Sequence, residues 1–157
     1  MKLISACLVG CHCRYDGGSN AVDPFVKMVE NGEAVFVCPE QLGGLSTPRP
    51  PAQIVGGTGE DVLDGNAKVL TESGADVTAE FVRGAQEALR MAKLVGAKEA
   101  ILKERSPSCG SALIYDGTFT KGKRPGHGVT AALLERNGIK VCSEETYEPP
   151  KAKPDDK

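Results

Sequence analysis

The feature that most constrains the fold of this chain is the alternation of short apolar runs with helical patterns. The apolar runs of strand length are residues 2–7, Ala34 to Cys38, Ala100 to Lys103 and Ile139 to Cys142, with Gln53 to Val55 as a shorter extra candidate. Three helical patterns, each closed by a glycine, run from Asp23 to Gly32, from Thr78 to Gly96 and from Gly128 to Gly138. Because strands that alternate with helices build βαβ units, this order predicts an α/β fold. We expect a three-layer Rossmann-like domain with a small parallel sheet of four or five strands.

The longest helical pattern predicts a helix that packs one face on the sheet. Its apolar positions recur at helical spacing, at Val82, Ala85, Leu89, Ala92 and Val95. The chain shows no internal repeat, so residues 1–147 are predicted to form one domain. Residues 148–157 carry three prolines and mixed charge without an apolar pattern, which predicts a disordered tail.

The charge of the chain limits its partners. A formal net charge of -2 and a pI near 5.7 argue against a protein that holds nucleic acid by bulk charge, since that mode needs clustered Lys and Arg. The N-terminal stretch contains too few apolar residues for a signal sequence, and no apolar run approaches the roughly 18 residues of a membrane span. We therefore expect a cytoplasmic protein whose six cysteines stay reduced.

Three cysteines that are distant in the sequence follow three of the predicted strands. Cys7 closes the first strand, Cys38 closes the second, and Cys109 lies in the loop after the third. Ligands of open parallel sheets gather outside the carboxyl ends of the strands, and neighbouring strands lie about 4.8 Å apart. These thiols are therefore predicted to converge on a metal site. The alternative for Cys7 and Cys38 is that they are buried core residues, because free cysteine is among the most buried residue types.

The cysteines at the N-terminus form a short cluster, Cys7-x3-Cys11-x-Cys13. Its last gap is one residue shorter than in the C-x3-C-x2-C motif of radical enzymes that bind S-adenosylmethionine. A zinc site of four cysteines would need a second paired knuckle, and the remaining cysteines are isolated. We interpret Cys11 and Cys13 as loop residues near the site and Cys142 as a core residue.

Four blocks of the sequence resemble the thiouracil desulfurase (desulfidase) family, from about Ser5 to Glu145: "CLVGCHCRYDGG", "CPEQLGGLSTPRPPAQIVGG", "KERSPSCGS" and "GHGVTAALLERNGIKVCSEE". The resemblance implies an oxygen-sensitive [4Fe-4S] enzyme that removes sulfur from thiolated uracil bases. It implies that Cys7, Cys38 and Cys109 hold the cluster and leave the fourth iron open. It also implies that Glu40 is the catalytic carboxylate and Ser106 the catalytic serine.

The residue types suit that chemistry. Ordinary electron-transfer clusters have four cysteine ligands, so three ligands leave one iron as a Lewis acid for a thiocarbonyl sulfur. Glu40, two residues after Cys38, is placed to activate water or to move a proton. Further substrate contacts are predicted at polar residues of the surrounding loops: Arg14, Tyr15, Asp16, Arg49, Lys103 and Ser108. For Arg14, Tyr15 and Asp16 the alternative is a turn whose side chains support the loop, and for Arg49 it is a solvated charge.

The predicted substrate is a small thiolated base or nucleotide, since the mild acidity and the scarce aromatic residues favour it over tRNA. We expect a monomer or a small homo-oligomer. The competing function is a redox or metal-binding module, based on thiols or zinc, that uses Cys7, Cys11 and Cys13 without desulfurase activity.

Overall fold

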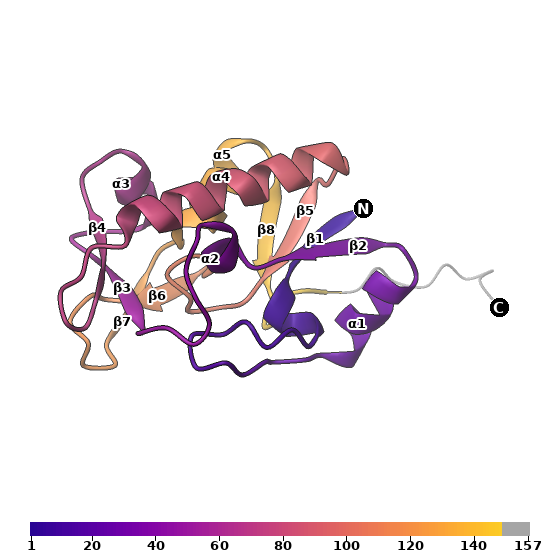
Figure 1. Ribbon diagram of the computed structural model, residues 1–157. Helices are drawn as coiled ribbons and strands as arrows, with labels where there is room; N and C mark the ends of the chain where they lie inside the picture. The colour runs from indigo at the N-terminus through magenta and orange to yellow at the C-terminus, as the bar shows by residue number, and fades with distance from the viewer. Residues whose placement is uncertain (149–157) are drawn as a thin grey trace.

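The computed structural model describes residues 1–148, and it contains a parallel sheet of four strands. The strand order is β2-β1-β5-β8, and every neighbouring pair is parallel (Figure 1). The strands are β1 (Lys2–Ser5), β2 (Ala34–Val37), β5 (Glu99–Leu102) and β8 (Lys140–Ser143). The predicted α/β fold with a small parallel sheet is confirmed. The predicted tail, apart from Glu148, lies outside the described residues.

Helices cover both faces of this sheet and make the predicted three layers (Figure 1). On one face lie α1 (Asp23–Glu30) and the 3-10 turn η1 (Ala6–Val9), which pack with Ile4 and Ile101 around Phe25. On the other face lie α4 (Thr78–Leu94) and α5 (Val129–Arg136), whose alanines and leucines pack on Leu3 and Leu102. The first strand is shorter than expected, because β1 ends at Ser5 and the chain turns into η1 before Cys7.

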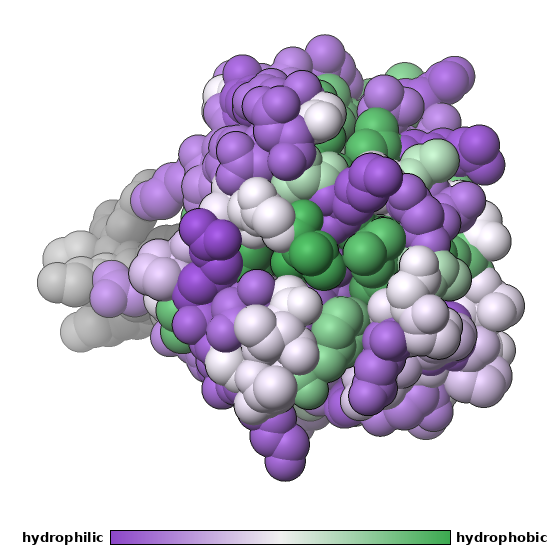
Figure 2. Space-filling model, turned by 90° about the vertical axis from the view of Figure 1, so that its left-hand side faces the viewer, coloured by the Kyte–Doolittle hydropathy of each residue, from purple (hydrophilic) through white to green (hydrophobic). Residues whose placement is uncertain are grey.

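Two antiparallel hairpins form a separate small lobe beside the main sheet. One hairpin pairs β3 (Ala52–Val55) with β4 (Lys68–Thr71), and the other pairs β6 (Leu113–Tyr115) with β7 (Lys123–Pro125). Together with α3 (Gly59–Leu63) they share an apolar cluster with α4 and α5. The strand expected at Gln53 to Val55 exists, but it belongs to this lobe and not to the parallel sheet. Figure 2 faces this side of the molecule, where apolar residues reach the surface among hydrophilic ones.

The buried face of α4 is rotated slightly from the one predicted. Its buried side chains are Phe81, Ala85, Ala88 and Ala92, whereas Val82 and Leu89 are only half-buried. Gly84 lies on this buried face, and a side chain there would collide with the carbonyl group of Pro39. This close approach admits α2 (Pro39–Leu42), a single turn directly after Cys38. Proline favours such a turn when it occupies the first helical position.

Within residues 1–148, no helix combines the length and the apolar character that crossing a bilayer requires.

Candidate active site

The candidate site lies at the carboxyl-terminal edge of the main sheet, between β1 and β5. The chain leaves β1 toward the α1 face and leaves β5 toward the α5 face, so these neighbours form the switch point at which open parallel sheets bind ligands. Cys7 lies in η1 directly after β1, and Cys109 lies in the loop after β5. Cys38 follows β2 as the N-cap residue of α2. The three predicted thiols therefore come from three adjacent strand ends.

The side chains of these cysteines interact with one another. The Cys13 thiol lies beside the sulfurs of Cys7 and Cys38 and lowers the pKa of both, and the Cys38 sulfur lies 3.8 Å from the Cys13 carbonyl oxygen. Cys109 is hydrogen-bonded to the Ser5 hydroxyl and lies within reach of the charges of Cys7 and Cys38. The structure thus brings the three predicted residues together. It also places Cys13 next to both Cys7 and Cys38, a position that the spacing of the cysteines in the sequence did not predict.

The four thiols differ in how easily they ionise. The hydrogen bond from Cys13 lowers the pKa of Cys7. The same thiol, helped by a backbone N–H and by the Arg49 charge, lowers the pKa of Cys38 to about 7. Hydrogen bonding to both neighbouring sulfurs raises the pKa of Cys13, and burial raises the pKa of Cys109. The site therefore combines two thiols that ionise readily with two that keep their protons.

The other two cysteines lie further from this centre. Cys11 is half-buried, and its pKa is raised by burial and by the charges of Cys38 and Cys7. Cys142 lies half-buried on β8 with its sulfur 3.6 Å from the Ala100 carbonyl oxygen, and burial raises its pKa to about 11. All six cysteines are free thiols, as expected.

Glu40 and Ser106 lie beside the thiols and face each other. The Ser106 hydroxyl oxygen is 3.5 Å from Oε1 of Glu40. The other carboxylate oxygen, Oε2, accepts hydrogen bonds from Nε of Arg49 at 2.8 Å and from its Nη2. The side chains of Arg49 and Glu40 are only 6% and 14% exposed, so this ion pair is largely shielded from solvent. The two predicted catalytic residues are thus brought together, and one oxygen of the carboxylate is left toward the serine.

The loop that carries Ser106 and Cys109 is held by the start of α5. The Ser106 hydroxyl accepts the backbone N–H groups of Ser108 and Cys109, both at 3.1 Å. The first N–H groups of α5 donate to this loop, with Thr130 bonded to the Ser108 carbonyl at 2.8 Å. The approach is so close that a side chain at Gly128 would collide with the Ser108 backbone. Ser108 itself is 1% exposed and its hydroxyl pairs with that of Thr130 at 2.7 Å, so it is not free to contact a substrate.

Lys103 lies at the end of β5, close to the Cys7 sulfur, whose pKa its charge helps to lower. Its ammonium group forms an ion pair of 3.0 Å with Glu144, a residue that follows β8 and that the sequence did not indicate. Its backbone N–H donates to the Ser5 hydroxyl at 2.9 Å. Lys103 therefore places a positive charge next to the thiols, with one side of the ammonium group already occupied.

The polar residues after the first cysteines mostly support their own loop. Arg14 binds Asp16 at 2.9 Å and the Asn20 amide oxygen at 3.1 Å, and Asp16 also accepts the Gly18 N–H. Asn20 in turn is hydrogen-bonded to the Cys7 side chain and lowers its pKa, a role that no motif indicated. Tyr15 is 45% exposed, which leaves its ring accessible. The arrangement favours the supporting alternative for Arg14 and Asp16.

A buried carboxylate, Glu104, organises the loop between β5 and β6. It is 4% exposed, and its Oε1 accepts the N–H groups of Ser111, Ala112 and Leu113 at 2.9, 3.1 and 3.2 Å. Its Oε2 accepts the Ser111 hydroxyl at 3.0 Å. Burial alone would raise the pKa of Glu104, but these hydrogen bonds outweigh it and lower the pKa. Sequence reasoning missed this residue, because a single Glu after a strand carries no distinguishing pattern.

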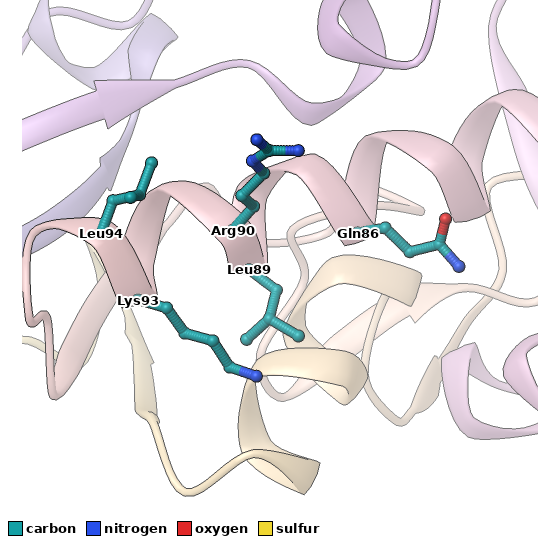
Figure 3. Close-up of a pocket in the computed structure, with 5 residues that line it drawn as sticks. All are labelled: Gln86, Leu89, Arg90, Lys93 and Leu94. Carbon is teal, nitrogen blue, oxygen red and sulfur yellow. The ribbon is translucent and has the colours of Figure 1, made fainter.

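A hollow on the outer surface of α4 is separate from this site. It is lined by residues of that helix alone: Gln86, Leu89, Arg90, Lys93 and Leu94. Figure 3 shows Leu89 and Lys93 directed toward α5, while Arg90 and Leu94 extend from the opposite side of the helix. None of the predicted site residues contributes to it.

The chemistry of the site suits an iron–sulfur cluster. Four thiols from three loops meet beside the positive charges of Lys103 and Arg49, and cysteine thiolates are the usual ligands of such clusters. Across residues 1–148, no three His, Cys, Asp or Glu side chains are arranged as ligands of one metal ion. A multi-iron cluster does not need that arrangement, because each thiolate binds a different iron. Nothing in this geometry favours the zinc alternative.

Comparison with known proteins gives consistent matches over nearly the whole chain. A family model described as 2-thiouracil desulfurase matches residues 3–146. The chain is 55% identical over 144 residues to the uncharacterized protein YbbK of Bacillus subtilis (strain 168), which is 92% of this chain and 95% of YbbK. Among solved structures, TudS, a [4Fe-4S]-dependent thiouracil desulfidase, matches with a TM-score of 0.81 and 48% identity. That match covers 91% of this chain and 89% of TudS.

Proposed function

The chain belongs to the 2-thiouracil desulfurase family, and we propose that it is a [4Fe-4S]-dependent enzyme that removes sulfur from a thiolated uracil. One observation carries the proposal. Within the residues that match the family, cysteines from three separate strand ends meet at the switch point of the sheet, beside a serine and a carboxylate. The substrate we favour is a free base or a nucleotide, and the location we favour is the cytosol, where six thiols stay reduced.

The proposed cluster ligands are Cys7, Cys38 and Cys109, one from each strand end. Bound there, the cluster would supply an iron that acts as a Lewis acid toward the thiocarbonyl sulfur of the substrate. Cys13, whose thiol lies beside the sulfurs of Cys7 and Cys38 and lowers the pKa of both, would act as a donor to those ligands. Hydrogen bonds to ligand sulfurs and the degree of solvent exposure set the reduction potential of such clusters.

The proposed reaction converts a thiocarbonyl group and water into a carbonyl group and hydrogen sulfide. Glu40 Oε1, the oxygen left free by Arg49, takes a proton from the attacking water. The Ser106 hydroxyl orients that water or the substrate. A carbon–oxygen bond forms, the carbon–sulfur bond breaks, and the departing sulfur takes up two protons. The carbon keeps its oxidation state, so the chemistry needs no external reductant.

The test is anaerobic reconstitution with iron and sulfide, followed by assay of sulfide release from thiouracil and from thiouridine monophosphates. Glu40→Gln should keep the visible absorption of the cluster and lose activity by about a hundredfold or more, because the general base is removed. Glu87→Gln, a change at an exposed position on α4, is the matched control and should behave like the wild type. Full turnover in Glu40→Gln would show that the carboxylate has another role.

A further inference from the structure

Arg49 forms as many hydrogen bonds as its side chain can donate. A guanidinium group carries five N–H donors. Nε and one Nη2 donor bind Oε2 of Glu40, and the other Nη2 donor binds the Cys13 carbonyl at 2.9 Å. The two Nη1 donors bind the Ser46 carbonyl at 3.1 Å and the Thr47 hydroxyl at 3.0 Å. No donor is left for a substrate.

We infer that Arg49 is a positioning residue that fixes the orientation of Glu40, and not the substrate-binding residue that its sequence position suggested. Both of its bonds to the carboxylate go to Oε2, so this oxygen is blocked from the reaction side. The other oxygen, Oε1, is thereby turned toward the Ser106 hydroxyl. With Arg49 in place, the carboxylate presents one defined oxygen to the reacting atoms.

The same guanidinium group joins two of the segments that carry thiols. It binds the carbonyl of Cys13 in the first segment and the side chain two residues after Cys38 in the second. The backbone N–H of Arg49 also donates to the Tyr15 carbonyl at 2.8 Å. A lysine would keep the charge, but a single ammonium group cannot reach carbonyl, hydroxyl and carboxylate partners that are spread around a planar fork.

A residue that only braced these loops would affect the protein differently from one that orients the base. Loss of a brace would loosen the thiol-bearing segments and reduce cluster loading. Loss of a substrate contact would raise KM and leave kcat unchanged. A positioning residue changes kcat at constant KM and constant cluster content, since a displaced catalytic group costs about a hundredfold in rate.

The experiment compares Arg49→Ala and Arg49→Lys with the wild type and with Arg83→Ala, a change at an exposed arginine of α4. We expect both Arg49 variants to load iron like the wild type, to keep KM, and to lose about a hundredfold in kcat. Added methylguanidinium should restore part of the kcat of Arg49→Ala but not of Arg49→Lys, whose lysine fills the space. Should Arg49→Ala not fold, Arg49→Lys carries the test alone, because it retains the buried charge.

The kinetic measurements on the Arg49 variants rest on the proposed function. A second measurement does not depend on turnover. In cluster-free protein, hydrogen exchange of residues 40–47 should become faster in Arg49→Ala and should slow again when methylguanidinium is added. If the wild type fails to release sulfide while exchange responds in this way, the proposed function fails, and the hold of Arg49 on the segment that carries Glu40 stands. An increase in KM with unchanged kcat, or unchanged exchange in Arg49→Ala, would overturn the inference.

Discussion

Two of the three loops that deliver cysteines to the same sheet edge are built in different ways. The thiol loop, residues 6–20, is held by half-exposed polar side chains such as Arg14 and Asp16 and by contacts among its own cysteines. The Cys109 loop, residues 103–113, is held by a buried carboxylate, Glu104, and by the first N–H groups of α5. The second loop is therefore held by groups in the interior, whereas the first combines buried cysteines with half-exposed polar side chains.

The difference extends to the thiols. Cys7 and Cys38 have partners that stabilise their ionised forms, and their pKa values are lowered. Cys109 has one such partner, the Ser5 hydroxyl, but burial outweighs it and raises the pKa of this thiol. On one side of the site, at the ends of β1 and β2, the thiols are thus expected to be reactive and the loop after β1 to tolerate substitution. On the other side, the Cys109 thiol is expected to be unreactive and its loop to be sensitive to substitution. Three predictions follow from this contrast, in order of decreasing effect.

The largest effect is expected for Glu104→Gln. This change removes the charge that accepts several hydrogen bonds in the interior and places an amide N–H group among N–H donors. We expect a loss of about 3 kcal/mol in the free energy of unfolding, measured by urea denaturation at pH 7. Glu145→Gln, at an exposed position paired with Arg105, is the control and should cost less than about 1 kcal/mol.

The same variant carries a pH dependence. Because the folded protein lowers the pKa of Glu104, this group stabilises the fold above its ordinary pKa, and the stabilisation is lost as the pH falls toward the lower folded value. The difference between wild type and Glu104→Gln should therefore shrink from about pH 5 to about pH 3. A constant difference over that range would contradict the role of the ionised carboxylate.

The next effect concerns thiol reactivity in cluster-free protein. Because the thiolate is the nucleophile, Cys38 should react with iodoacetamide at pH 7.5 about a hundredfold faster than Cys109. Mass spectrometry of the labelled peptides measures both rates, and Cys142, with its pKa raised to about 11, is an internal control that should react slowly. In denaturant the three rates should become similar. Equal rates for Cys38 and Cys109 in the folded protein would remove the contrast between the two sides of the site.

The smallest effect is expected for Asp16→Asn in the thiol loop. Its ion pair with Arg14 joins side chains that are 44% and 35% exposed, and such pairs contribute less than about 1 kcal/mol. Asparagine can still accept the Gly18 N–H, so the turn should persist. Urea denaturation should detect a change below about 1 kcal/mol, and a loss as large as that of Glu104→Gln would mean that the two loops are equally dependent on single side chains.

Local patterns predicted much of the fold. Apolar runs and glycine-closed helical segments located the four parallel strands and the helices α1, α4 and α5, because their spacing is a property of neighbouring residues. The hairpin strands β4, β6 and β7 were missed; β6 and β7 have only three residues each, and β7 is exposed throughout. The turn α2 was missed because four residues are too few to show a helical period. The contacts of Gly43 and Gly84 with opposing backbone, which make room for it, join segments that are far apart in the sequence.

The sequence by itself determined the parallel α/β architecture, the family through four ordered motif blocks, and the three strand ends that carry Cys7, Cys38 and Cys109. Only the tertiary structure determined which polar groups already form hydrogen bonds within the protein. In the fold, every side-chain donor of Arg49 is hydrogen-bonded, the Ser108 hydroxyl is buried against Thr130, and Cys13 lies next to two other sulfurs. The physical reason is that hydrogen bonds between groups far apart in the chain depend on how the loops cross. Residue types and their spacing report only on interactions between residues that are neighbours in the sequence.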